Sequence, residues 1–138
     1  MSQIKALPAP TVLDASAILA LLFNEPNSDT VATALQHERC MVTAANHAEV
    51  IAKLLDRGLS PPDVAAALSA LPMQVIDSTA ADGEAAGYMR SASRAIGLSL
   101  GDRLCLASAQ RMGAGVVTAD RAWLELGNAL NLSIVCIR

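Results

Sequence analysis

Aromatic residues are almost absent from this 138-residue sequence, which has one Phe, one Tyr and one Trp. The interior must therefore be built from Ala, Leu, Ile and Val, and no aromatic stripe is present on which nucleotide bases could stack. Apolar residues nevertheless make up 53% of the chain and charged residues 17%. This composition excludes an intrinsically disordered chain and a coiled coil.

Cysteine and long apolar runs are also scarce. Cys40, Cys105 and Cys136 are an odd number of cysteines without a C-x-x-C spacing, which argues against a disulfide scaffold and a zinc knuckle. They are typical of reduced core residues in a cytoplasmic protein. The most apolar segment near the N-terminus, residues 15–23, is far shorter than the about 20 residues of a membrane span. We therefore expect a cytoplasmic protein with no signal peptide and no membrane helix.

Positive charge is not in excess, since the formal net charge is -3. This balance argues against a broad basic face that coats duplex nucleic acid. It leaves room for an enzyme that holds a short nucleic-acid segment through a metal ion and a few arginines. The length fits one domain over residues 1–138. Pro8 and Pro10 predict that residues 1–10 are a loose lead-in.

Short apolar runs alternate with helical patterns along the chain. Strands are expected at residues 12–13, 40–42, 73–76, 116–118 and 134–137. Helices are expected at residues 16–23, 28–37, 43–56, 60–71, 79–96, 99–113 and 121–126. No two-residue hairpin turn separates the strand segments, so the pattern predicts an α/β fold in which a five-stranded parallel sheet is covered by helices on both faces.

Two helices carry more detailed expectations. Ser16 is expected to cap the first helix. In the helix over 79–96, five residues at helical spacing form an apolar stripe. They are Ala81, Ala85, Tyr88, Ala92 and Ile96.

Four acidic residues are placed where a parallel sheet collects its functional groups, beyond the carboxyl ends of the strands at the point where strand order reverses. Asp14 follows the first strand and Asp120 the fourth. Glu49 lies on the helix after the second strand, and Asp102 lies in the first turn of the helix before the fourth. We expect these four carboxylates to converge on one rim of the sheet.

Each acid also has an ordinary structural explanation. Asp102 could complete a capping box at the start of its helix, and Asp120 could cap the short helix that follows it. Glu49 has Lys53 four residues later and could belong to a solvent-exposed helix face. Asp14 is the hardest to explain this way, because a buried unpaired charge is costly and its sequence neighbours carry no positive charge.

Converging carboxylates need a counter-charge, because two unit charges 4 Å apart repel by about 4 kcal/mol at an effective dielectric near 20. A set of oxygen ligands without Cys or His favours Mg²⁺ or Mn²⁺. Such an ion polarises a phosphoryl oxygen and lowers the pKa of a bound water that attacks phosphorus, which predicts a phosphodiester substrate. Ser16 and Thr118, each two residues from an acid, could orient a carboxylate or a bound water, or could serve only as a helix cap and a strand end.

Four segments of the chain resemble, in order, the signature segments of a known family. They are LDAS with Asp14, NHAEV with Glu49, LSLGDRLCLA with Asp102 and VVTADRAW with Asp120. From Thr11 to the C-terminus the sequence is similar to the PIN-domain ribonucleases, in the compact form of the VapC-type toxins of bacterial toxin-antitoxin pairs.

The resemblance implies a PIN-like, three-layer α/β/α sandwich and an Mg²⁺- or Mn²⁺-dependent endoribonuclease that acts as a toxin. Asp14, Glu49, Asp102 and Asp120 would be its catalytic, metal-binding acids. The resemblance also implies a homodimer and a cognate antitoxin that inserts a peptide into the acidic groove. DNA binding would occur only through the antitoxin.

Two arginines stand beside these acids in the sequence. Arg103 follows Asp102 and Arg121 follows Asp120. Both are candidate RNA contacts, and both could instead form surface salt bridges. Without aromatic residues for stacking, the cleaved RNA and its sequence are left open.

Other enzyme classes fit less well. An aspartyl-phosphate enzyme usually needs a second Asp where this chain has Ser16, and a receiver domain needs a late lysine, whereas the last one here is Lys53. The triplet at residues 47–49 is shared with zinc deaminases, but no P-C-x-x-C follows it. Cys105 lacks an evident activating base. The remaining alternative is a non-catalytic PIN-like interaction module whose acidic groove binds a basic partner peptide.

Overall fold

The structure is a computed structural model that describes residues 10–138. The expected lead-in over residues 1–10 therefore lies outside the described residues, apart from Pro10. The strands are β1 (Thr11–Leu13), β2 (Cys40–Thr43), β3 (Met73–Ile76), β4 (Gly115–Thr118) and β5 (Ile134–Cys136). The helices are α1 (Ala15–Leu22), α2 (Asp29–His37), α3 (Ala44–Asp56), α4 (Pro61–Ser69), α5 (Ala80–Ser93), α6 (Leu100–Met112), the 3₁₀-helix η1 (Arg121–Leu126) and α7 (Gly127–Leu130). Over residues 10–138, none of these helices is both long and apolar enough to cross a membrane.

The five strands form one parallel sheet in the order β3-β2-β1-β4-β5. This confirms the predicted five-stranded parallel sheet. The chain runs outward from β1 to β2 and β3 on one side, then returns to place β4 and β5 on the other. Strand order therefore reverses between β1 and β4, and a crevice is expected beyond their carboxyl ends.

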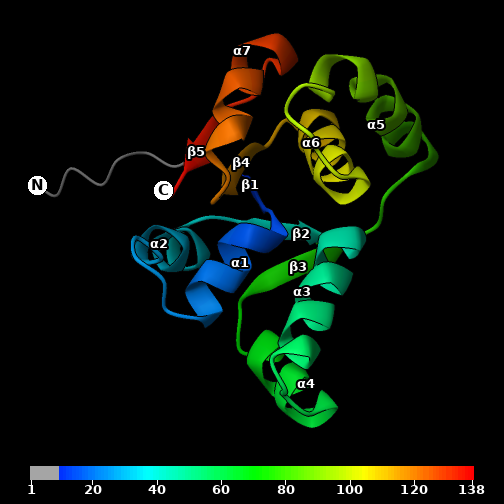
Figure 1. The fold of residues 1–138 in the computed structure, drawn as a ribbon. Coiled ribbons are helices and arrows are strands. Elements are labelled where there is room, and N and C mark those ends of the chain that lie inside the picture. The colour runs from blue at the N-terminus through cyan, green and yellow to red at the C-terminus, as the bar shows by residue number, and fades with distance from the viewer. Residues whose placement is uncertain (1–9) are drawn as a thin grey trace, which may run out of the picture.

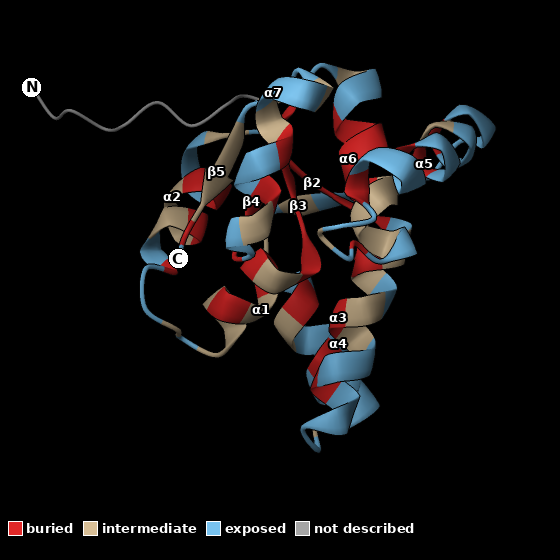
Figure 2. Ribbon diagram, turned by 45° about the horizontal axis from the view of Figure 1, so that its top comes forward, coloured by how far each residue is buried: buried red, intermediate tan, exposed pale blue. Residues whose placement is uncertain are grey.

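Helices cover both faces of the sheet, so the three-layer α/β/α sandwich is also confirmed. Helices α1 to α4 lie on one side, and α5, α6 and α7 lie on the other (Figure 1). Alternate strand residues feed two separate cores. Leu13, Val42 and Val117 belong to one core, and Val12, Met41 and Val116 belong to the other. The buried residues fill the central strands β1, β2 and β4 and the inner faces of the helices (Figure 2), whereas the edge strands β3 and β5 are partly exposed.

Side-chain caps begin most of the helices. Thr43, Ser60, Thr79 and Ser99 accept a hydrogen bond from the backbone N–H three residues later, which satisfies a donor that the helix leaves unpaired. The expected cap of the first helix is wrong. The N-cap of α1 is Asp14, because its carboxylate accepts the Ala17 N–H.

Helix α5 also differs from its prediction, because it ends at Ser93 and buries a different face. The expected stripe is wrong: Tyr88 is 79% exposed, whereas Asp82 is only 1% exposed. Asp82 faces α6, where it accepts hydrogen bonds from Ser108 Oγ at 3.0 Å and from Arg111 Nε at 2.8 Å. The buried face of α5 therefore lies about one residue further along the chain than the expected stripe, because the helix is turned so that the Asp82 carboxylate reaches these partners.

Candidate active site

The four acids expected to converge line one recess of about 200 Å³ at the carboxyl ends of β1 and β4. Asp14 directly follows β1, and Asp120 is the second residue after β4. Glu49 enters from α3, and Asp102 enters from the first turn of α6. Lys53 lies on the same wall as the acids. The structure therefore gathers residues that are far apart in the sequence at the point where the strand order reverses.

Asp14 is the most constrained of the four. Its side chain is 3% exposed, and Oδ1 accepts the Ala17 N–H at 2.8 Å. The Ser16 hydroxyl donates to the carboxylate at 2.8 Å, and the Thr118 hydroxyl donates to Oδ2 at 2.6 Å. Ser16 Oγ in turn accepts the Ala119 N–H at 2.9 Å. Both hydroxyls therefore touch the carboxylate and fix its orientation.

The charge on Asp14 is only partly stabilised by these contacts. Burial is the main reason that the net pKa of Asp14 is raised from 3.8 to about 6. Hydrogen bonds from Thr118, Ala17 and Ser16 lower it, and the charge of Asp102 raises it again. No cation forms an ion pair with Asp14 within residues 10–138. A positively charged ligand would therefore stabilise the ionised form of this buried carboxylate.

Asp102 and Asp120 both serve as structural caps, as their sequence positions suggested. Asp102 Oδ2 accepts the Ser99 N–H at 3.0 Å in a capping box, and Asp120 Oδ1 accepts the Ala122 N–H at 3.0 Å. In the part of the chain that the structure describes, the second oxygen of each carboxylate takes no hydrogen bond. Capping and a place in the recess are thus compatible, because each role uses a different oxygen.

Glu49 is held in a crowded corner that sequence reasoning did not identify. Burial raises its pKa, and the charge of Asp102 raises it further, while Asn46 and Lys53 oppose the shift. A methyl group at Gly101 would overlap Glu49 Oε1 and lie 3.4 Å from Asn46 Nδ2. The Gly-Asp pair at 101–102 was the available signal, because glycine before a functional residue permits a close backbone approach.

Asn46, like Gly101, belongs to the site but was not identified from the sequence. It lies one turn before Glu49 on α3 and is fully buried. Over residues 10–138, neither its amide nitrogen nor its amide oxygen has a hydrogen-bond partner with good geometry. An unsatisfied buried amide is costly and often marks a functional site. Here it adjoins the carboxylate of Glu49, whose charged form it favours.

The two candidate RNA arginines have different surroundings. Arg103 Nη1 donates to the Ala86 carbonyl of α5 at 2.9 Å, and its Nε is buried. Its guanidinium therefore fastens α6 to α5. Arg121 is exposed and lines a neighbouring recess together with Asp120 and Arg138. Neither arginine forms a salt bridge within residues 10–138, so Arg121 is the one that stays accessible.

The side chains that line the recess have the donor chemistry that a hard cation prefers. Among the residues from 10 onward, no three His, Cys, Asp or Glu side chains are arranged to hold an ion directly. The donors lining the recess are nevertheless four carboxylates, with no thiolate and no imidazole. Mg²⁺ usually keeps several waters and takes only one or two carboxylates. The donor set therefore fits Mg²⁺ or Mn²⁺ held partly through water.

Cys105 lies close to the acids but is unsuited to nucleophilic catalysis. It is fully buried, and burial raises the pKa of its thiol well above the ordinary value. The charges of Asp14, Asp102 and Glu49 raise it further. The thiolate is the reactive form of cysteine, so these surroundings keep Cys105 a neutral core residue.

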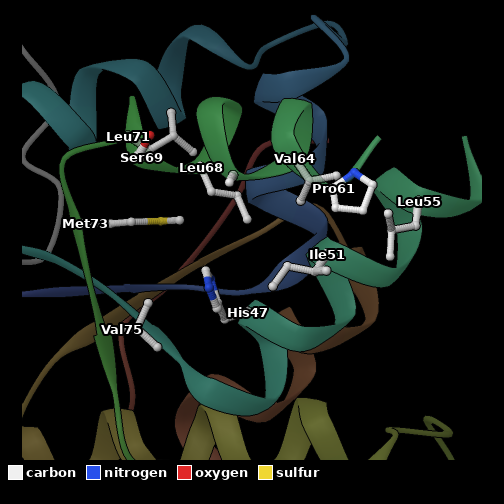
Figure 3. A pocket seen from close by; sticks show the side chains of 11 residues that line it. His47, Ile51, Leu55, Pro61, Val64, Leu68, Ser69, Leu71, Met73 and Val75 are labelled. Carbon is white, nitrogen blue, oxygen red and sulfur yellow. The ribbon is translucent and has the colours of Figure 1, made fainter. Parts of the chain in front are cut away.

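A larger recess of about 550 Å³ lies elsewhere, between α3, α4 and β3 (Figure 3). Its wall is mostly apolar and includes Ile51, Leu68 and Met73 but no acid. His47 lines this recess, whereas Glu49 lines the acidic one. The two residues of the His-x-Glu triplet therefore face different cavities, which argues against a shared zinc site.

Comparison with known proteins agrees with this geometry. The family model described as the PIN domain matches residues 11–128. No curated protein sequence matches the chain. Among solved structures, a toxin-antitoxin complex from Klebsiella pneumoniae has a TM-score of 0.73 and 16% sequence identity, and the match covers 93% of this chain and 98% of that chain.

Two further structures have the same fold. VapBC2 from Rickettsia felis, bound to a DNA fragment from its promoter, has a TM-score of 0.69 and 16% identity, with 91% of this chain and 97% of that chain covered. VapC20 from Mycobacterium tuberculosis, a sarcin-ricin loop cleaving toxin, has a TM-score of 0.68 and 17% identity, with 85% and 95% covered. At such identities the likeness establishes a common fold.

Proposed function

This chain belongs to the PIN domain family, and from that premise we propose that it is a divalent-metal-dependent endoribonuclease acting as the toxin of a toxin-antitoxin pair. One observation carries the proposal: Asp14, Glu49, Asp102 and Asp120 line the same recess where the strand order reverses. Solved structures of the same fold include toxin-antitoxin complexes and a sarcin-ricin loop cleaving toxin, which supports the choice of reaction.

The bound ion, Mg²⁺ or Mn²⁺, would polarise a phosphoryl oxygen and supply an activated water for in-line attack on phosphorus. The four acids would hold it, directly or through its waters. Ser16 and Thr118 keep the Asp14 carboxylate in a single orientation through their hydroxyl groups. Thr118 Oγ1 also accepts the Asp120 N–H at 3.0 Å, so one hydroxyl group links the acid after β1 to the acid after β4.

The proposal includes the partners that a toxin of this kind requires. A cognate antitoxin would place a basic peptide against the acidic recess, where opposite charges attract, and would carry any DNA binding of the complex. We propose that the chain is cytoplasmic and forms a homodimer. Light scattering of the purified protein measures the oligomer directly, and a monomer at micromolar concentration would contradict that part.

Cleavage of RNA by the purified protein tests the function. We expect Mg²⁺ or Mn²⁺ to raise the melting temperature and to support cleavage of total RNA, and EDTA to abolish both effects. Asp14→Asn and Asp120→Asn should lose the cleavage and the metal-induced shift while remaining folded. Cleavage at the parent rate by both variants would refute the assignment.

The same experiment tests the non-catalytic alternative. That alternative is favoured by one observation, namely that Asp102 and Asp120 already cap helices. An interaction module would bind a basic peptide through the acidic recess and would leave RNA intact with every metal tested.

If the protein does cleave RNA, mapping of the cleavage sites after induced expression identifies the target RNA.

A further inference from the structure

A second recess adjoins the acidic one and has the opposite charge. Its volume is about 410 Å³, and it shares Ser16, Leu19 and Lys53 with the acidic recess. Arg57 and Arg138 line its far side. We call it the basic recess. It lies between α1 and the second half of α3. These two helices pack on the same face of the sheet (Figure 1).

Three cationic side chains line this recess against two carboxylates. Arg138 is paired with Glu25 at 2.8 Å, and both side chains remain partly exposed. Lys53 and Arg57 form no salt bridge within residues 10–138, although Asp56 is also on the wall. Two exposed cations are therefore available to an anionic ligand at the edge of an acidic site, where a polyanion would otherwise be repelled.

Arg57 is positioned by the only phenylalanine of the chain. Its guanidinium carbon lies 4.2 Å from the centroid of the Phe23 ring, which is a cation–π contact. This contact holds the guanidinium at the wall of the basic recess, because Phe23 and Arg57 both line it. Nucleotide bases stack on such guanidinium planes as they do on aromatic rings.

We propose that the basic recess binds the nucleotide that flanks the scissile phosphate of a single-stranded RNA, with Lys53 and Arg138 near its phosphate and Arg57 against its base. This inference rests on the proposed nuclease function and deepens it. The shared wall of Ser16, Leu19 and Lys53 provides the continuity that a strand needs to pass from one recess to the next. The recess therefore adds binding energy outside the reacting group.

RNA binding by an inactive protein tests the proposal without cleavage. The background is Asp14→Asn, and the probe is a fluorescein-labelled single-stranded RNA of mixed sequence and about 12 nucleotides. Arg57→Ala should weaken binding by about fivefold to a hundredfold, the effect of losing one stacked base. Lys53→Met should weaken binding less and should reduce the slope of log Kd against log salt by about 0.7. The matched control is Arg90→Ala, which removes an exposed arginine from α5 and should leave binding unchanged.

A conservative change separates charge from stacking. Arg57→Lys keeps the positive charge but loses the planar group, so it should behave like Arg57→Ala at high salt, where phosphate attraction is screened. In the otherwise unsubstituted enzyme, Arg57→Ala and Arg57→Lys should raise KM for RNA with little change in kcat. Circular dichroism confirms that each variant is folded.

The outcomes distinguish this inference from the proposed function. If the parent neither binds nor cleaves RNA, the nuclease assignment fails. If the parent cleaves RNA but Arg57→Ala and Lys53→Met bind RNA as Arg90→Ala does, only the basic recess assignment fails. If an oligoglutamate peptide of equal charge binds as tightly as RNA and depends on Arg57 in the same way, the recess is a peptide site and the RNA assignment is overturned.

Discussion

The Thr118 hydroxyl donates a 2.6 Å hydrogen bond to Asp14 Oδ2, joining the ends of two adjacent strands that lie 104 residues apart in the sequence. The bond lowers the pKa of a carboxylate that burial raises. It is therefore a contact that supports both the fold and the charge state of the recess.

Replacing this hydroxyl by a methyl group should damage both. We expect Thr118→Val to lower the free energy of unfolding by about 2 kcal/mol, because Asp14 loses a donor and the Asp120 N–H loses its acceptor. The acidic limb of the pH–rate profile should move to higher pH, since the Asp14 pKa rises further. Urea denaturation and cleavage rates between pH 5 and 8 measure the two effects. Thr118→Ser keeps the hydroxyl and should resemble the parent; an unchanged Thr118→Val would show that the bond contributes nothing.

Asp14→Asn should stabilise the metal-free protein at neutral pH. The folded-state pKa of Asp14, about 6, is above its ordinary value of 3.8, so the folded state binds the extra proton. The stability that this group contributes is fully present below pH 3.8 and is lost as the pH rises through about 6. The pKa shift from 3.8 to about 6 corresponds to a loss of about 3 kcal/mol in the free energy of unfolding above pH 6. Asn cannot ionise, so the variant avoids this loss.

Comparison of parent and variant isolates this group from the other carboxylates. The stability advantage of Asp14→Asn should shrink by about 2 kcal/mol between pH 7.5 and pH 4.5. Urea denaturation in EDTA at the two pH values measures it. An advantage that stays constant or grows toward low pH would contradict the raised pKa.

Gly101→Ala should reduce cleavage more than stability. The added methyl group would displace the flexible end of Glu49, so we expect at least about a tenfold loss of activity, comparable to the cost of misplacing a catalytic group. The matched control is Gly87→Ala in α5, where a methyl group meets nothing within 4 Å; it should stabilise the protein by about 0.5–1 kcal/mol. Full activity of Gly101→Ala would show that the position of Glu49 is not critical.

Arg111→Met should destabilise the fold without changing the chemistry. It leaves Asp82 buried without its cation, and breaking such pairs costs about 3–5 kcal/mol. Because the Arg111 side chain is 39% exposed, we expect a value near the lower end. The pKa of Asp82 is lowered, since its hydrogen bonds to Arg111, Thr79 and Ser108 outweigh the effect of burial.

The stability that the Arg111–Asp82 ion pair contributes should therefore disappear as the pH falls. A depressed folded-state pKa gives stability that is present above the ordinary value of 3.8 and is lost on acidification. Thermal denaturation of parent and variant at pH 7 and at decreasing pH should show the two curves converging. Arg94→Met removes an exposed arginine near the end of α5 and is the control. A constant difference across pH would contradict the assigned role.

The fold could be predicted from the sequence because strands and helix starts leave recognisable local patterns. The central strands β1, β2 and β4 are mostly apolar on both faces, and most helices begin at a recognisable capping residue such as Thr43 or Ser99. These are local signals, and they suffice to predict alternating strands and helices. The convergence of Asp14 and Asp120 then follows from topology, because β1 and β4 are neighbours.

The details that the sequence did not predict depend on partners from distant elements. The buried face of α5 is set by Asp82 and its contact with Arg111, and an alanine-rich helix offers no apolar pattern strong enough to reveal it. The Arg103 guanidinium, a candidate RNA contact or salt-bridge partner, donates to the Ala86 carbonyl, a bond that depends on the packing of α6 against α5. The corner formed by Asn46, Glu49 and Gly101 is visible only once α3 and α6 are packed together.

The position of β4 beside β1 has a consequence for how the protein is made. A growing chain that has been translated only as far as α6 contains three of the four acids. It lacks β4, the strand beside β1, and with it Thr118, whose hydroxyl donates a hydrogen bond to Asp14. A polypeptide that ends before β4 therefore lacks the complete acidic recess. If the chain degrades RNA, it can do so only after the segment through Asp120 has been synthesised.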